Sequence, residues 1–370
     1  MTKNIAVLPG DGIGPEVIKQ GMKVLDAIAE RYGYTLNYTY ASVGACAIDE
    51  FGDPLPKTTS DICYNSDAIL FGAIGDPKYD NDPSAKVRPE QGLLKLRKMM
   101  GLFCNMRPVK TFDNLLHLSP LKAELVKDVD FVIYRELTGG IYFGEKGISD
   151  DGQTAYDQMI YTVEEIDRIA HLAFKAAMNR RKKLTLVDKA NVLESSRLWR
   201  SRVRELASQY PEVTMEYMFV DNAAMQLVQN PGAFDVVLTG NMFGDILSDE
   251  ASVLQGSLGM LPSASVGKHV AMFEPIHGSY PQVAGQDIAN PMATVLSVAM
   301  MLDHFEMHKA ARSVRRAISI CLEHDLGTPD LRTGMTLTCS EIGDLLASLI
   351  SDGVEALNMD KLKESNSTII

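Results

Sequence analysis

The sequence predicts an α/β fold with largely parallel central sheets, divided between two domains. Short apolar runs alternate along the chain with longer amphipathic patterns, and this alternation is typical of parallel sheets covered by helices. The chain has 370 residues, more than one hydrophobic core usually accommodates, which indicates about two domains. Hydrophobic residues make up 46% and charged residues 23% of the chain, as in ordinary globular proteins.

The N-terminal part begins with an apolar run at 3–9, a glycine-rich loop and an amphipathic segment at 15–33. This segment is predicted to be a helix that ends at Gly33, because glycine is common at helix C-termini. The other elements predicted in this part are strands at 34–41 and 68–75, a short helix at 58–66 and a loop at 76–90.

The middle of the chain continues the alternation. Segment 162–180 repeats apolar residues at helical spacing and is predicted to bury one face. The residues of that face are Ile166, Ile169, Ala173, Phe174 and Ala177. Segments 130–137 and 141–145 are predicted to be paired strands. The remaining predictions are extended segments at 102–109, 183–188, 214–220, 234–240 and 269–275, and helices at 92–100, 193–210, 221–229, 292–324 (two helices) and 340–351.

Charge and cysteine content exclude several classes of protein. The net charge of −12 argues against nucleic acid or an anionic membrane as partner, since both attract basic surfaces. The five scattered cysteines contain no C-x-x-C pair, which favours a reducing cytoplasm over a disulfide framework or a zinc site. The N-terminus does not have the pattern of a signal peptide. No apolar run reaches the roughly 20 residues that span a bilayer.

The segment 240–260 contains two aspartates at helical spacing. Asp245 and Asp249 are four residues apart, so a helix opened by Asp245 would carry both carboxylates on one face. Like charges at that spacing repel unless a positive group lies between them, and a divalent cation with oxygen ligands is such a group. The alternative is that Asp245 caps the helix and Asp249 is a solvated surface residue.

Polar residues follow three successive predicted strands. Lys189 follows 183–188, Asp221 follows 214–220, and Asp245 comes shortly after 234–240. Parallel sheets bind ligands at the carboxyl ends of their strands. These residues, with Asp249, therefore predict a shared site that holds three aspartates and an amine.

Three arginines are candidates for binding carboxylates. Arg97 lies in a helical pattern, Arg107 in an extended one, and Arg135 at the end of an apolar run. A guanidinium in such a run needs a partner, and its planar fork suits carboxylates. The arginines are either three separate structural ion pairs or a clamp for an anionic dicarboxylate.

Several motifs together resemble one family. RPEQGLLKLRK, RELTGGIYFGE, DKANVL, GNMFGDILSDEAS and GDGIGPEV resemble the metal-dependent β-decarboxylating dehydrogenases, which include isocitrate, homoisocitrate and isopropylmalate dehydrogenases. The resemblance runs from about residue 4 to 353 in the family's order. PEQGLLKLRK is typical of the isopropylmalate branch.

The resemblance implies a fold that is not a Rossmann fold, and GDGIG indeed lacks the G-x-G-x-x-G spacing. It implies a first, cofactor-side domain made of residues 1–102 and 256–370. It implies a second domain, residues 103–255, that carries the metal site and forms a homodimer. The active site would lie between the domains and take residues from both subunits.

The implied reaction is oxidative decarboxylation of 3-isopropylmalate to 2-oxo-4-methylpentanoate with hydride transfer to NAD, a step of leucine biosynthesis. Asp245, Asp249 and the partner subunit's Asp221, which would also contact the substrate, would bind Mg²⁺ or Mn²⁺. The partner subunit's Lys189 would help to remove the hydroxyl proton, and Tyr142 would protonate the enol at carbon.

The resemblance also implies the substrate and cofactor contacts. The substrate carboxylates would meet Arg97, Arg107 and Arg135, and the side group would meet Glu90, Leu93 and Leu94. The NAD contacts would come from Ile13, Glu274, His277, Gly278, Ser279, Gln282 and Asn290.

The chain departs from the family pattern at two positions. Gln282 stands where an aspartate usually accepts a hydrogen bond from the NAD ribose and repels the 2′-phosphate of NADP. No Lys or Arg replaces it, so NAD is predicted with weaker discrimination. Asp76 stands where glycine is common, and the sequence offers no purpose for it.

Other functions remain open at this point. Within the family, the substrate could be homoisocitrate, isocitrate, tartrate or D-malate. A phosphoryl transferase would use GDGIGP as a phosphate cradle, but the loop lacks the Lys-Ser/Thr of a P-loop. A non-catalytic dicarboxylate-binding protein would share the arginines but would not need Lys189 and Tyr142 beside a metal.

Overall fold

The computed structural model describes residues 2–80 and 87–352. Within the chain, two compact units form: unit 1 comprises residues 1–90 and 273–370, and unit 2 comprises residues 91–272. Both are mixtures of helices and mostly parallel strands, which confirms the predicted α/β fold. No helix in these described ranges combines the length and apolarity that crossing a membrane requires.

Unit 1 is built around four neighbouring strands in the order β2–β1–β3–β12. β1 pairs in parallel with both β2 and β3. The elements of this unit are β1 (Thr2–Gly10), α1 (Gly14–Tyr32), β2 (Thr35–Tyr40), α2 (Ala45–Phe51), α3 (Lys57–Tyr64), β3 (Ala68–Ala73), α4 (Pro77–Asp80), β12 (Ala271–Pro275), α11 (Met292–His304), α12 (His308–Glu323), β13 (Leu326–Gly327), β14 (Met335–Thr336) and α13 (Cys339–Asp352).

Unit 2 contains six neighbouring strands in the order β11–β4–β5–β10–β8–β9. β5, β10, β8 and β9 run parallel, whereas β4 is antiparallel to both of its neighbours. The elements of this unit are α5 (Pro89–Met99), β4 (Cys104–Lys110), η1 (Asp113–Leu118), α6 (Ala123–Val126), β5 (Asp130–Glu136), η2 (Gly140–Tyr142), β6 (Lys146–Ile148), β7 (Ala155–Asp157), α7 (Val163–Met178), β8 (Lys183–Asp188), α8 (Glu194–Ala207), β9 (Thr214–Phe219), α9 (Val220–Gln229), β10 (Val236–Thr239), α10 (Asn241–Ser252) and β11 (Pro262–Val266).

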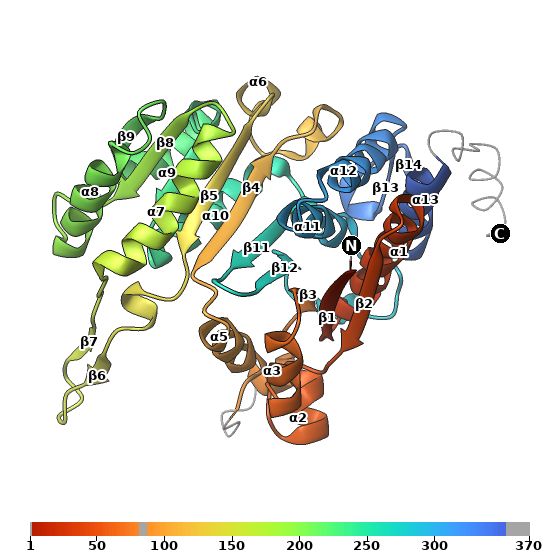
Figure 1. Cartoon of the computed structure of the whole chain (residues 1–370), viewed down its shortest axis with the longest axis horizontal. Helices are drawn as coiled ribbons and strands as arrows, with labels where there is room; N and C mark the ends of the chain where they lie inside the picture. The colour runs from red at the N-terminus through yellow and green to blue at the C-terminus, as the bar shows by residue number, and fades with distance from the viewer. Residues whose placement is uncertain (1, 81–86, 353–370) are drawn as a thin grey trace. The chain divides into compact units, whose positions relative to one another are not determined.

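Helices cover both faces of the unit 2 strands, which explains why these strands are almost continuously apolar. Figure 1 shows α7 and α8 on the near side and α9 and α10 on the far side. Successive residues alternate between the faces: Leu184 and Leu186 pack with α7 and α8, while Val187 packs with α9 and α10. The polar residues that follow the strands are thus held by a packed core.

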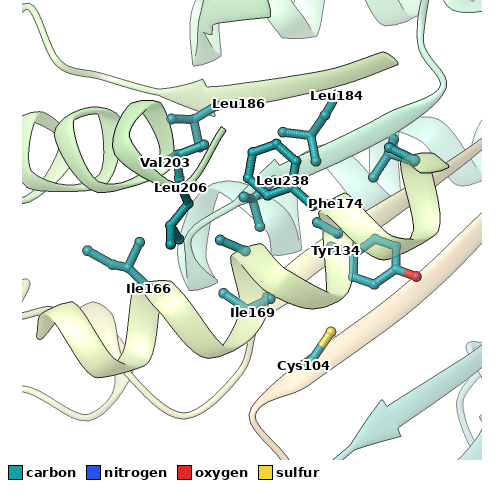
Figure 2. Packing of buried hydrophobic residues seen from close by; sticks show 14 of the residues in the cluster. Cys104, Tyr134, Ile166, Ile169, Phe174, Leu184, Leu186, Val203, Leu206 and Leu238 are labelled. Atoms are coloured by element: carbon teal, nitrogen blue, oxygen red, sulfur yellow. The ribbon is translucent and has the colours of Figure 1, made fainter. Parts of the chain in front are cut away.

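The core on the α7 face contains every apolar residue that the helical spacing selected, and all five are fully buried. Figure 2 shows Ile166 and Ile169 of α7 on the side of the helix that faces Val203 and Leu206 of α8, with Phe174 further along, beside Leu238 and Leu184. Burying a side chain as large as Phe174 contributes about 1.5–3 kcal/mol. At the start of α7, Thr162 and Glu165 form a reciprocal capping box, which satisfies backbone N–H groups that the first helical turn leaves unpaired.

Three local predictions are wrong. Segment 141–145 is not a strand beside β5, because β5 already pairs with β4 and β10 and the turn after it forms η2. A separate hairpin, β6–β7, follows instead. The helix that carries Asp245 begins at Asn241 rather than at Asp245. The predicted loop 76–90 contains α4 and the first residues of α5, and its residues 81–86 lie outside the described ranges.

The two units divide at residues 90/91 and 272/273, whereas the predicted domains divide at 102/103 and 255/256. Two contacts account for the difference. The backbone carbonyl of Met100, just after α5, lies against Gly267. β11 pairs antiparallel with β4, so the residues after 255 complete the sheet of unit 2.

Candidate functional site

Asp245 occupies the second turn of α10, where its carboxylate contacts two side chains from other elements. One carboxylate oxygen accepts from Arg135 at the end of β5, and the other accepts from the Tyr142 hydroxyl at 2.5 Å. Asp245 therefore does not cap the helix, and α10 has no side-chain cap. The capping alternative for Asp245 is wrong because the helix begins one turn earlier.

Arg135 is the most buried charged group of this cluster, with 5% of its side chain exposed. Burial, opposed by the attraction of Asp245, lowers its pKa to about 10, and the positive charges of Arg107 and Arg97 act in the same direction as burial. The guanidinium thus stays charged at neutral pH. The structure brings the three predicted arginines near one another, as a clamp for carboxylates requires.

Tyr142 lies at the C-terminal end of η2, with its ring 5.7 Å from the guanidinium of Arg135. Burial and the hydrogen bond to Asp245 raise the pKa of its phenol. The phenol is therefore protonated at neutral pH and can donate a proton. This geometry suits the role of an acid that the sequence suggested for Tyr142.

Asp249 pairs with the second predicted arginine. Nη1 of Arg107 lies 2.8 Å from the Asp249 carboxylate and 2.7 Å from the Ser248 hydroxyl. Asp249 and Asp245 thus lie on one helical face, and each has a guanidinium partner. These ion pairs balance the repulsion expected between carboxylates four residues apart.

Two buried asparagines that the sequence reasoning missed complete these arginine contacts. The Nε atom of Arg107 donates to Oδ1 of Asn105 at 2.8 Å, and the Nε atom of Arg135 donates to Oδ1 of Asn241 at 3.2 Å. A polar residue inside the extended segment of Arg107, and another at the start of the aspartate helix, were the signals that could have identified them.

Lys189 and Asp221 form a second cluster, with Nζ of Lys189 2.6 Å from a carboxylate oxygen of Asp221. The hydrogen bond from Lys189 lowers the pKa of Asp221. The preceding residue, Asp188, is buried and accepts from both Arg200 and the backbone of Ala190. The neighbours of Lys189 are thereby held in place at the carboxyl end of β8.

The four residues predicted to share one site lie in two separate networks within a single chain. Lys189 and Asp221 bind each other, whereas Asp245 and Asp249 bind arginines. Across residues 2–80 and 87–352, no three His, Cys, Asp or Glu side chains gather in a group that could hold a metal ion. The family resemblance implies such a separation, because it assigns Lys189 and Asp221 to the site of a partner subunit, and this assignment stays a prediction.

Four predicted substrate contacts lie on α5. Glu90, Leu94 and Arg97 recur at helical spacing, with Leu93 beside them. Leu94 is exposed, although apolar side chains of its size usually pack inside. Along α5, two leucines therefore lie between the carboxylate of Glu90 and the guanidinium of Arg97.

The predicted NAD contacts lie in unit 1. Ile13 and Ser279 are joined by a backbone hydrogen bond of 2.8 Å, so the GDGIG loop lies against the segment 277–282. Nδ2 of Asn290 donates to Asp330 at 3.0 Å. Glu274 is buried at the end of β12, and Gln282 lies in a short 3₁₀ turn.

His277 has an enclosed imidazole whose pKa is lowered by burial. Its Nδ1 atom lies 3.0 Å from the carbonyl oxygen of Gly278, while Nε2 is buried without a hydrogen-bond partner among the described residues. A neutral ring that donates from Nδ1 leaves Nε2 as an acceptor. This acceptor is available to a ligand donor.

The structure supplies a local purpose for Asp76. Its carboxylate accepts from the backbone N–H of Lys78 at 3.0 Å, in the first turn of α4. The preceding residue, Gly75, donates to the buried carboxylate of Asp11. Asp76 therefore stabilises a turn next to a tethered backbone segment.

The comparisons with known proteins identify the family of the chain. Residues 4–346 match the family model described as isocitrate/isopropylmalate dehydrogenase. The chain is 55% identical over 352 residues to a 3-isopropylmalate dehydrogenase from Bacteroides fragilis, covering 95% of this chain and 99% of that protein. It is 51% identical over 365 residues to one from Aquifex aeolicus, covering 98% of both.

Among solved structures, the isocitrate dehydrogenase from Methylococcus capsulatus matches with a TM-score of 0.84 at 33% identity. The match covers 95% of this chain and 100% of that one. Family model, relatives and fold therefore agree over nearly the whole length. The chain belongs to the isocitrate/isopropylmalate dehydrogenase family.

Proposed function

We propose that this chain oxidises 3-isopropylmalate with NAD and a divalent cation, releasing carbon dioxide and 2-oxo-4-methylpentanoate. The observation that carries the proposal is the cluster in which Asp245 binds Arg135 and Tyr142 together, in a chain 55% identical to a 3-isopropylmalate dehydrogenase. The five free cysteines support a reducing, cytosolic location.

The carboxylates of unit 2 fit a divalent cation chemically. Asp245 and Asp249 offer hard oxygen donors four residues apart on α10, which are the ligand types that Mg²⁺ and Mn²⁺ prefer. Asp249 and Asp221 are largely exposed, at 70% and 62%, so both can reach a ligand. A bound cation supplies a Lewis acid at the substrate oxygens.

Unit 1 offers groups that fit NAD. The unpartnered Nε2 of His277 is a buried acceptor, and a Cβ atom on Gly278 would meet nothing within 4 Å. The backbone there is accessible to a ligand. NAD, when bound, accepts the hydride from C2 of the substrate. Gln282 carries no charge to repel a 2′-phosphate, so we expect only moderate preference for NAD over NADP.

The chain's own residues bind the substrate and move its protons. The clustered guanidiniums of Arg97, Arg107 and Arg135 bind the two carboxylates. The partner subunit's Lys189 removes the proton of the C2 hydroxyl with its unprotonated amine, which becomes an ammonium. After carbon dioxide leaves, the hydroxyl of Tyr142 donates a proton to the enol carbon, and the 2-oxo acid results.

Leu93 and Leu94 favour a substrate with a branched alkyl side group over a substrate with a third carboxylate. Apolar side chains give an isopropyl group a favourable contact, whereas the extra carboxylate of isocitrate would lose hydration against them. D-malate and tartrate lack the alkyl group and would leave these leucines without contact.

A homodimer is part of the proposal. Met225 and Val228 of α9 and Ile246 of α10 are large apolar side chains with 44–60% of their surface exposed. Exposed apolar residues on adjacent helices mark a protein–protein interface. A second copy packed there would bring the partner's Lys189 and Asp221 to the Asp245 cluster.

The test is a substrate panel with NADH formation as the readout. We expect the highest kcat/KM with 3-isopropylmalate and NAD, and loss of activity when EDTA removes the cation. The panel includes D-malate, tartrate, isocitrate and homoisocitrate, each with NAD and NADP. Turnover of D-malate without turnover of 3-isopropylmalate would overturn the proposal.

A further inference from the structure

Arg107 and Arg135 are held in the same way, each by a buried asparagine at the Nε edge of the guanidinium. Asn105 is 1% exposed and Asn241 0% exposed. Asn241 accepts twice through its side chain, from Nε and from Nη2 at 2.9 Å, and once through its backbone carbonyl at 3.0 Å. The same asparagine–arginine contact is thus made from two different elements, by Asn105 of β4 and by Asn241 of α10.

Both amides are locked from their other side. Nδ2 of Asn105 donates to the hydroxyl of Ser265 on β11 at 3.1 Å. Nδ2 of Asn241 donates to the backbone carbonyl of Gly139 at 3.1 Å. Gly139 directly precedes η2, the turn that ends at Tyr142. Because Nδ2 of each asparagine donates to these groups, Oδ1 is the atom that faces the arginine and accepts its hydrogen bond.

The chemical choice of acceptor has an electrostatic consequence. A buried guanidinium is most often paired with a carboxylate, which orients it and also cancels its charge. An amide oxygen orients the guanidinium through a hydrogen bond but leaves its charge in place. In unit 2 of one chain, Arg107 already pairs with Asp249 and Arg135 with Asp245, and the two neutral amides add no further negative charge beside either guanidinium.

We propose that Asn105 and Asn241 are positioning residues that aim Arg107 and Arg135 at the substrate carboxylates without neutralising them. The inference rests on the proposed function, because it assumes that these arginines bind a dicarboxylate. Asparagine is suited to this task because an aspartate would be a nearly isosteric acceptor that competes with the substrate for each guanidinium.

Replacement by aspartate tests this because it retains the acceptor that faces the guanidinium and adds a negative charge, although it also removes the Nδ2 donor. Asn105→Asp is the primary variant, since the Ser265 hydroxyl can donate to the new carboxylate. Asn241→Asp is the second variant and places a carboxylate beside the Gly139 carbonyl. Asn179→Asp is the matched control, because Asn179 is exposed at the end of α7 and its amide bonds only to a helix carbonyl.

We expect Asn105→Asp to raise the KM for 3-isopropylmalate and its Kd, measured by calorimetry with Mg²⁺ and no NAD, by roughly tenfold or more. The KM for NAD and the melting temperature should stay close to wild type, and kcat should change by no more than about twofold, since uniform binding is what the arginines supply. The control should match wild type in KM, Kd and kcat.

A purely structural role predicts a different result. The aspartate would then preserve the hydrogen bond and strengthen the pairing, so KM and Kd would not rise. That outcome overturns the inference, while wild-type activity still supports the proposed function.

If Asn105→Asp does not fold, Asn105→Ser supplies a shorter neutral acceptor. The inference is supported when the rise in Kd for 3-isopropylmalate is ten times smaller in Asn105→Ser than in Asn241→Asp. Equal rises in Kd contradict it. Wild-type protein that neither binds nor oxidises 3-isopropylmalate overturns the proposed function and this inference together.

Discussion

Asp245 is the residue at which the contacts of unit 2 converge. It accepts from a buried guanidinium and from a phenol at once, so its carboxylate orients both Arg135 and Tyr142. Such a carboxylate is a poor site for substitution, because its loss would leave Arg135 buried without its ion-pair partner.

Tyr142→Phe tests the role of the phenol more cleanly, since Tyr142 is 41% exposed and its ring is retained. We expect kcat to fall by about 10²–10⁴-fold, as for loss of a general acid, with an unchanged melting temperature. Tyr156→Phe is the control, because Tyr156 is similarly exposed, at 45%, and its hydroxyl donates to Glu145 rather than to a residue of the site. A kcat within twofold of wild type for Tyr142→Phe would rule out this role.

At the residue scale, the sequence predicted charged groups better than neutral ones. Lys189 and Asp221 lie close together because the parallel strands β8 and β9, which they follow, end at the same edge of the sheet. The apolar runs that form these strands are visible in the sequence. Asn105 and Asn241 could not be predicted in this way. Their role depends on arginines brought near by folding, 106 positions away along the chain in the case of Asn241 and Arg135, and an isolated asparagine carries no sign of its partner.

At the scale of elements, α7 shows how a helix start positions part of the core. The Thr162 hydroxyl accepts from the Glu165 backbone, and the Glu165 side chain accepts from the Thr162 backbone. Five fully buried apolar residues follow within the same helix. The cap therefore determines where the buried face begins.

Thr162→Ala should lower the free energy of unfolding by about 1 kcal/mol, within the 0.5–2 kcal/mol typical of lost N-caps. Urea denaturation followed by circular dichroism measures the loss. Ser201→Ala, an exposed substitution within α8, should change stability by less than about 0.5 kcal/mol. Equal effects of the two substitutions would show that the capping box does not stabilise α7.

Regular elements with strong apolar periodicity were predictable, and irregular ones were not. β11 has the sequence PSASV, whose small and polar residues do not resemble a strand, and it is recognised as one by its pairing with β4. The hairpin β6–β7 is exposed along most of its length, so no buried pattern marks it. Asp245 was misplaced as a helix start because Gly240 and Gly244 both resemble helix boundaries.

At the scale of the whole molecule, the fold class and the family were predictable because the motifs extend over nearly the full chain. The division into units was less so, since the strand that joins β4 comes from residues after 255. Exposed apolar residues on α9 and α10 could not be recognised from sequence, because the same residue types also form buried helical faces.

Ile246→Asp should convert the proposed dimer to monomer, because it places a charge among exposed apolar side chains of α9 and α10. Light scattering after gel filtration measures the mass, and activity should fall in parallel. Tyr64→Asp is the control, since Tyr64 is 68% exposed in α3 of unit 1. A dimeric Ile246→Asp protein, or a fully active monomer, would contradict a site shared between subunits.

On the proposed function, the separation of Lys189 and Asp221 from Asp245 and Asp249 within one chain predicts that two different defective chains complement each other. Lys189→Met and Asp249→Asn chains would each be inactive as homodimers. Refolded together from an equal mixture, half of the dimers would be mixed, and each mixed dimer would contain one site with both native residues. Activity should then recover to about a quarter of wild type, a fraction set by symmetry and random pairing alone.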